Sequence, residues 1–178
     1  MKTIKVISLG FVLVFFIISC NKKESIKEST GINIEQTAPE IMLEAIFNKE
    51  DKKIPTLSSL KNEIIILDFW ATWCAPCIAS FPEHDKLQLK YKDNGVQFIA
   101  ITDDSKEKLN NFLGNTNYSF WIGRDDDKSI FNRYNISDRP RIFIINRDGK
   151  IVYKGAKITE EIIIEALNNN INIEVENK

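Results

Sequence analysis

Two cysteines at a redox-competent spacing, Cys74 and Cys77, are separated by Ala75 and Pro76. When such a pair is reduced, the first thiol can lie at the N-terminus of a helix, where the macrodipole and the free N–H groups favour an anion. Only a thiolate attacks a disulfide sulfur. We therefore expect Cys74 to be the nucleophile. We expect Cys77, one turn deeper, to resolve the mixed disulfide by attacking Cys74.

Metal binding and an inert structural disulfide are the alternative uses of this pair. Tetrahedral zinc needs four ligands, but the chain adds only a distant Cys20 and one histidine, His84, which we expect on a helix surface. A disulfide that closes so short a loop stabilises a fold little, because the entropic gain grows with loop length. Both alternatives are therefore weaker than redox chemistry.

The apolar pattern predicts the elements that position the pair. Residues 64–69 form an apolar run interrupted only by Asp68, as in a strand buried on both faces. Pro76 suits the first turn of a helix that continues to Tyr91. Further strands are predicted over 96–101, 118–122, 142–145 and 151–153, and further helices over 109–113, over 128–134 and after Thr159.

The order of these elements indicates the fold class. Alternating strand and helix units, followed by a hairpin and a final helix, predict an α/β domain with a mixed sheet flanked by helices. The dipeptide Asp148-Gly149 is expected to turn the hairpin, because it supplies the positive φ angles of tight turns. Residues 37–60 are expected to add a strand or hairpin before the sheet.

The N-terminus has the layout of a secretory signal. Lys2 and Lys5 precede an apolar run over 6–18, which is too short to cross a bilayer as a helix. The run ends in Ser19-Cys20, which resembles the bacterial lipobox. That resemblance implies that a diacylglycerol group is attached to Cys20 and that cleavage leaves this cysteine as the new N-terminus. A plain signal peptide that contains a cysteine is the alternative.

The segment from Ile66 to Cys77 resembles the active-site strand and loop of the thioredoxin superfamily, and Pro82 matches the proline inside the following helix. Arg139-Pro140 resembles the cis-proline loop that faces the cysteines in that superfamily. The lead-in before Leu60, the Thr-Trp-Cys variant and a central strand–helix insertion between Ala100 and Arg139 are similar to the TlpA/ResA-like, membrane-anchored branch.

This resemblance implies an extracytoplasmic thiol–disulfide oxidoreductase that needs no cofactor or metal. Its partners would be disulfide-containing proteins, including apocytochromes c, and a membrane thiol transporter as electron donor. It implies four regions: a lipoprotein signal peptide over 1–20, a flexible tether over 21–37, a thioredoxin-like domain over 38–172 and a tail over 173–178. The localisation implied is a bacterial cell membrane, facing the periplasm in a Gram-negative cell.

The resemblance also assigns roles around the cysteines. Asp68 stands where cytoplasmic thioredoxins have a buried aspartate, whereas the TlpA-like branch often has asparagine, and Ser80 stands where ResA-like members carry a glutamate. We expect Asp68 to accept the Cys77 proton through water. Trp73 is expected to cover one side of the pair, and Pro140 to border the substrate segment. One expectation for Arg139 is a cation near Cys74 that lowers the pKa of its thiol; the alternative is an exposed arginine that makes surface contacts only.

Two other classes of function stay open at this stage. A peroxiredoxin has a related fold but needs threonine or serine three residues before its reactive cysteine, where this chain has Ala71. A non-catalytic or metal-binding lipoprotein module is the other. Nucleic acid is excluded as a partner, because the 178-residue chain has a formal net charge of −1 and therefore no overall positive field.

Overall fold

The central strand of the sheet is β2 (Ile64–Trp70), in which all seven residues are buried. A computed structural model describes residues 32–114, 116–169 and 173–174. In it β2 runs parallel to β3 and antiparallel to β5, within a seven-stranded mixed sheet of order β1-β4-β3-β2-β5-β6-β7. The other strands are β1 (Ala45–Phe47), β3 (Val96–Thr102), β4 (Trp121–Arg124), β5 (Arg141–Ile145), β6 (Ile151–Gly155) and β7 (Ile173–Glu174).

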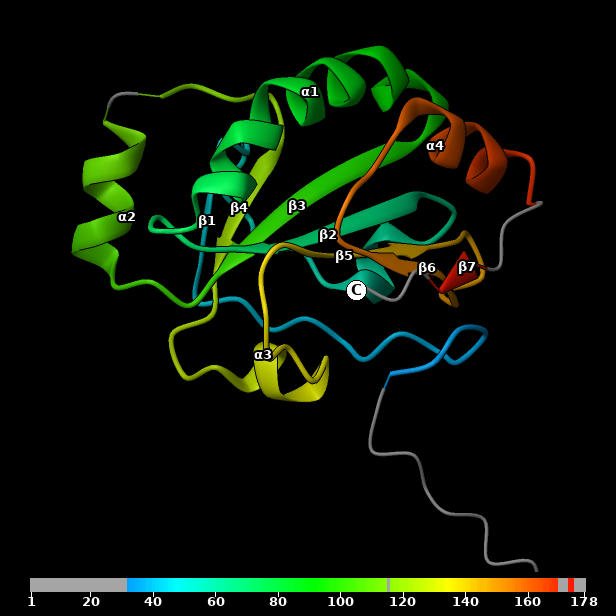
Figure 1. Cartoon of the computed structure of the whole chain (residues 1–178), viewed down its shortest axis with the longest axis horizontal. Helices are drawn as coiled ribbons and strands as arrows, with labels where there is room; N and C mark the ends of the chain where they lie inside the picture. Colours follow the sequence, from blue (N-terminus) through cyan, green and yellow to red (C-terminus); the bar gives the residue numbers. More distant parts are fainter. Residues whose placement is uncertain (1–31, 115, 170–172, 175–178) are drawn as a thin grey trace, which may run out of the picture.

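Helices cover both faces of this sheet (Figure 1). The long helix α1 and the helix α4 lie on one face, and the short helix α3 lies with the N-terminal segment on the other. The helices are α1 (Ala75–Tyr91), α2 (Lys106–Leu113), α3 (Ser129–Arg133) and α4 (Glu160–Leu167), and two 3-10 turns span Leu57–Leu60 and Lys92–Asn94. A mixed sheet flanked by helices is therefore confirmed.

The side chains of β2 alternate between two apolar cores. Ile64, Ile66 and Trp70 pack in the core that contains Cys77 and other residues of α1. Ile65, Leu67 and Phe69 pack in the core that contains α3 and the N-terminal segment. Because successive side chains of a strand point to opposite faces, Asp68 shares the face of Ile66 and Trp70. The one carboxyl group of β2 therefore points toward α1.

Most predicted elements occur within one or two residues of their expected positions. The strand expected over 118–122 begins later, at Trp121, and the lead-in over 37–60 contains one short strand, β1, antiparallel to β4, rather than a hairpin. In the β5–β6 hairpin only Gly149 has positive φ, 76°, and its N–H donates to the carbonyl of Asn146. The turn is thus longer than a two-residue Asp-Gly turn, and the ladder shifts register at Ile144/Ile145.

The packed domain begins earlier than the boundary predicted at residue 38. Ile32 is buried, the N–H of Glu35 donates to the carbonyl of Ile151, and the N–H of Ile151 donates to that of Gln36. These contacts place 32–37, the end of the expected tether, against the edge of the sheet. At the other terminus β7, which falls in the predicted tail, pairs in parallel with β6. The predicted signal peptide over 1–20, with Cys20, lies outside the described residues.

Candidate active site around Cys74 and Cys77

The first cysteine sits at the junction between β2 and α1. The chain leaves β2 at Trp70, and Cys74 becomes the N-cap of α1, with its N–H donating to the carbonyl of Ala71. Pro76 occupies the first turn, where its missing N–H costs no helical hydrogen bond. The Sγ of Cys74 accepts the N–H of Cys77 at 3.3 Å. A free backbone donor and the positive end of the helix dipole therefore converge on this sulfur, and both stabilise a thiolate.

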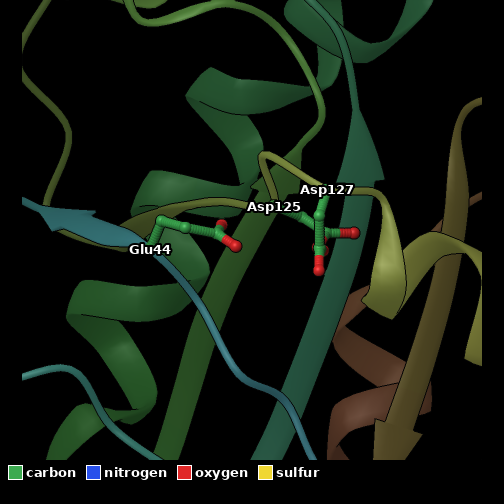
Figure 2. A group of neighbouring side chains, drawn as sticks. All are labelled: Glu44, Asp125 and Asp127. Atoms are coloured by element: carbon green, nitrogen blue, oxygen red, sulfur yellow. The ribbon is translucent and has the colours of Figure 1, made fainter.

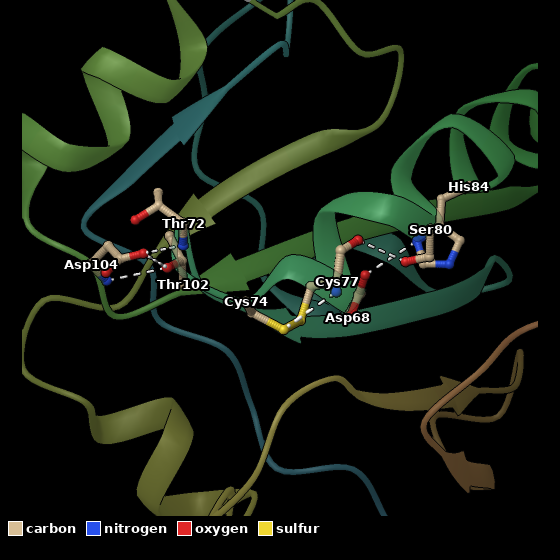
Figure 3. The surroundings of a disulfide bond; sticks show 8 residues. All are labelled: Asp68, Thr72, Cys74, Cys77, Ser80, His84, Thr102 and Asp104. Atoms are coloured by element: carbon tan, nitrogen blue, oxygen red, sulfur yellow. Dashed lines mark hydrogen bonds and ion pairs between the residues drawn. A yellow bond between two sulfur atoms is a disulfide. The ribbon is translucent and has the colours of Figure 1, made fainter.

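Cys74 and Cys77 form a disulfide in the structure, and the two sulfurs differ in access (Figure 3). Cys77 is 0% exposed and Cys74 is 4% exposed, while the side chain of the preceding Trp73 is among the most exposed apolar groups, at 66%. An approaching molecule therefore meets Trp73 and then Cys74. Cys74 is thus the more exposed of the two cysteines, although both are buried.

Asp104 anchors the loop that carries Trp73, a role that the sequence did not indicate. It is buried, and its Oδ2 accepts the N–H of Thr72 at 2.6 Å and the hydroxyl of Thr102 at 3.2 Å. Of the neighbouring polar residues Asp103, Asp104 and Ser105, Ser105 is the N-cap of α2. Since β2 and β3 are parallel, their ends meet at one edge, which brings Asp104 to the active-site loop.

Arg139 and Pro140 border the same surface from the other side. The Arg139–Pro140 peptide bond is cis, as the sequence resemblance implied. The guanidinium of Arg139 lies 5.4 Å from the centre of the Trp73 ring and pairs with Asp103 at 2.7 Å. Its charge is therefore balanced by a carboxylate, which argues against its use as a free cation for Cys74.

Beneath the first turns of α1, Asp68 meets a histidine. Asp68 Oδ2 lies 3.2 Å from His84 Nδ1, and the two side chains are only 2% and 4% exposed. The expectation of a surface histidine was therefore wrong. The signal that could have found it is spacing: Cys77, Phe81 and His84 recur at four and three residues, which places them on one helix face. Ser80, one position off that face, donates its hydroxyl to the carbonyl of Cys77.

A second group of carboxylates lies away from the cysteines, at the start of α3 (Figure 2). Oxygens of Glu44, Asp125 and Asp127 lie within 4.8 Å of one another. Each carboxylate accepts a backbone N–H: Asp125 from Ile130 and Phe131, Asp127 from Ser129, and Glu44 from Asp126. Because all three carboxylates bond to backbone N–H groups, we interpret them as caps of this loop and of the start of α3.

Comparison with known proteins agrees with this geometry. Residues 34–154 match the AhpC/TSA family. The chain belongs to this family. Thiol-disulfide oxidoreductase ResA of Bacillus subtilis is 33% identical to it over 148 residues, which cover 82% of this chain and 77% of that relative.

Solved structures agree with the fold of this AhpC/TSA-family chain. A Chlorobium tepidum protein assigned as the thiol:disulfide interchange protein DsbE superposes with a TM-score of 0.69 at 28% identity, covering 77% of this chain and 99% of that one. A Bacteroides thetaiotaomicron protein assigned as a protein disulfide isomerase superposes with a TM-score of 0.64 at 30% sequence identity, covering 79% of this chain and 91% of that one. The thioredoxin-like fold is therefore confirmed, and the protein is a thiol–disulfide oxidoreductase.

Proposed function

We propose that this protein reduces disulfides of other proteins, with Cys74 as the nucleophile and Cys77 as the resolving cysteine. The observation that carries the proposal is the asymmetry of the pair. Cys74 lies at the N-cap of α1 next to the exposed Trp73, and its sulfur accepts the N–H of Cys77, which is itself wholly buried. A thiolate is stabilised at the accessible position, and the second thiol is held where only Cys74 can react with it.

The reaction transfers two electrons from the Cys74–Cys77 dithiol to the substrate disulfide. The Cys74 thiolate attacks one sulfur of the substrate disulfide, forms a mixed disulfide and expels the other substrate sulfur as a thiolate, which takes a proton from solvent. Cys77 then loses its proton and attacks Cys74. The Cys74–Cys77 disulfide forms, and the second substrate sulfur leaves and is protonated. The substrate gains two thiols, and the enzyme keeps the disulfide seen in the structure.

Asp68 is the proposed acceptor of the Cys77 proton. It is buried on the α1 face of β2, and among the described residues its carboxylate meets only His84, whose Nδ1 lies 3.2 Å from Oδ2. A buried carboxylate near a thiol can take up the proton of that thiol, directly or across one water. Figure 3 shows its carboxyl group beneath the start of α1, between Cys77 and His84 in that view.

The proposed docking surface is made by Trp73 and the loop at Pro140. Trp73 offers an exposed ring, and the contact of Arg139 with that ring ties the two parts together. An extended segment of a protein disulfide fits such a surface, because its backbone can pair along the loop while its sulfur reaches Cys74. The relationship to ResA supports disulfide-containing proteins as substrates. Apocytochromes c are the proposed clients, and a membrane thiol transporter is the proposed donor that restores the dithiol.

The proposed location is the outer side of a bacterial membrane, with lipid attached at Cys20. The support is the basic, apolar and Ser19-Cys20 pattern of the first twenty residues. A diacyl anchor holds more firmly than one myristoyl chain, because each buried methylene adds about 0.8 kcal/mol. Within the part of the chain that the structure describes, no helix is both long and apolar enough to span a bilayer.

Substitution of each cysteine by serine tests the assignment. We expect Cys74→Ser to abolish turnover of a protein disulfide by the reduced enzyme, because no accessible thiolate remains. We expect Cys77→Ser to stop after one attack and to accumulate mixed disulfides, visible as adducts on non-reducing gels and by mass spectrometry. Multiple turnover by the Cys74→Ser protein would refute the proposal.

A further inference from the structure

Asp68 and His84 form a buried polar pair within an otherwise apolar core. The 3.2 Å contact joins a residue of β2 to a residue of α1, and both side chains are almost inaccessible to solvent. Aromatic rings enclose the imidazole, since the centroid of Phe98 lies 5.6 Å away and that of Phe81 lies 6.2 Å away. In such surroundings an isolated charge is costly, so the two groups depend on each other.

The position of the pair relates it to the cysteines. Cys77 and His84 are seven residues apart on the same buried face of α1, two helical turns or about 10 Å along the axis. Asp68 reaches up to this face from β2, and Figure 3 displays its carboxyl group between the two. Cys77 and His84 therefore lie on the helix face that Asp68 meets, and all three groups are buried and can each bind a proton.

Other titratable groups around this core are engaged elsewhere. The hydroxyl of Tyr91 donates to Glu160 at 2.6 Å, and the hydroxyl of Tyr153 donates to the carbonyl of Lys157. Tyr118 lies against Phe81, and the pKa of Tyr118 is raised by burial and by the carboxylate of Asp85. These tyrosines keep their protons near neutral pH, so Asp68 and His84 are the groups available to Cys77.

We infer that His84 is a positioning residue that shares one proton with Asp68, so that the pair, rather than the carboxylate alone, exchanges a proton with Cys77. This inference rests on the proposed function. When Cys77 gives up its proton, the pair changes from a net charge of −1 to neutral, with the proton held between the carboxylate and Nδ1. The Cys77 thiolate then displaces the substrate sulfur from Cys74. The proton leaves the pair when the enzyme is reduced again and Cys77 regains it.

The experiment separates the two chemical steps in one trace. The dithiol protein is mixed with 5,5′-dithiobis(2-nitrobenzoate): attack by Cys74 releases the first thionitrobenzoate, and resolution by Cys77 releases the second. For His84→Gln we expect first-step rates within twofold of wild type, and a second step at least tenfold slower at pH 7, in the range of general-base effects. Near pH 9.5 the defect should shrink to about twofold, because hydroxide then ionises Cys77, whose ordinary pKa is about 8.5.

Two further variants make the outcome decisive. Asp68→Asn should slow the same step, and the double variant should be no slower than the slower single variant, since both changes disable one unit. Gln88→Leu is the matched control: Gln88 is also buried on α1 and bonds to Val96 and Phe98, so it reports a structural change in the helix without touching the pair. Its second step should have the pH dependence of wild type.

A His84→Gln second step at the wild-type rate, a defect of equal size at all pH values, or additive effects in the double variant would each overturn the inference. If His84→Gln does not fold, Asp68→Asn alone decides it, because a wild-type second step in that protein removes the pair from the reaction. Failure of the proposed function looks different: Cys74→Ser would still release a first thionitrobenzoate at the wild-type rate, because Cys77 would then be the thiol that attacks.

Discussion

A single side chain, Asp104, fixes the loop on which the nucleophile depends. Its carboxylate accepts the N–H of Thr72 and the hydroxyl of Thr102, and so connects the end of β3 to the residue two before Cys74. Hydrogen bonds to a charged acceptor are stronger than neutral ones, and removing the acceptor leaves its donors without a partner. The orientation of Trp73 and Cys74 is therefore set by a residue that takes no part in the chemistry.

Replacement of Asp104 tests this positioning role. We expect Asp104→Ala to lower the free energy of unfolding by about 1–3 kcal/mol, measured by urea denaturation, because the donors on Thr72 and Thr102 lose their acceptor. Turnover should fall as the loop loosens. Asp104→Asn keeps one acceptor oxygen and should lose less of both. An alanine variant as stable and as active as wild type would rule out the role.

Among the elements, the short helix α3 is held by a residue that lies before it. Its formal N-cap, Lys128, has a left-handed backbone with φ of 60° and makes no side-chain cap. Asp125 Oδ2 instead accepts the N–H groups of Ile130 at 3.0 Å and Phe131 at 2.9 Å. Burial raises the pKa of Asp125, and the nearby carboxylates of Glu44 and Asp127 raise it further, against the lowering effect of the two N–H bonds.

The raised pKa of Asp125 sets the sign of a pH effect. The folded chain binds this proton more tightly than the unfolded chain, so the contribution of Asp125 to stability is largest at low pH and is lost as the pH rises through its folded pKa. Asp125→Asn mimics the protonated form and keeps the acceptor oxygen. We expect the free energy of unfolding of Asp125→Asn to equal or exceed that of wild type at pH 7. As the pH falls toward 4, the wild type is stabilised by protonation of Asp125, so the advantage of the variant should shrink.

The alanine variant is the reference for that comparison. Asp125→Ala removes the acceptor for Ile130 and Phe131, so it should destabilise the fold by about 1–2 kcal/mol in thermal or chemical denaturation, as lost helix caps do. A loss at pH 7 as large in Asp125→Asn as in Asp125→Ala would contradict the role given to the charge.

At the scale of the whole molecule, the described chain starts at the edge of the sheet, away from the cysteines. Ile32 accepts a hydrogen bond from Lys154 of β6, whereas Cys74 follows β2, and β5 separates the two strands. From Cys20 to Ile32 there are twelve residue steps, which can span at most about 40 Å. With lipid attached at Cys20, the proposed anchor would hold the domain by the β6 side and leave the Trp73 surface open to substrates.

The anchor is tested by fractionation of cells that express the full chain. We expect Cys20→Ala to move the protein from the membrane fraction to the soluble extracytoplasmic or precursor fraction, because the acyl chains that bind the bilayer are lost. Cys77→Ser, which leaves the N-terminus intact, is the control and should stay with the membrane. An unchanged membrane fraction for Cys20→Ala would leave the lipid anchor without support.

The sequence by itself determined the redox pair, its place between a buried strand and a helix, and the order of strands and helices, because these depend on local patterns of apolar residues, proline and caps. Only the tertiary structure decided that Asp68 meets His84, that Asp104 reaches Thr72 across 32 residues, and that 32–37 pack on the sheet. Those contacts depend on the parallel register of β2 and β3 and on which face of α1 lies on the sheet. The spacing of Cys77, Phe81 and His84 marks the buried face of α1, but no local pattern encodes the register of the two strands.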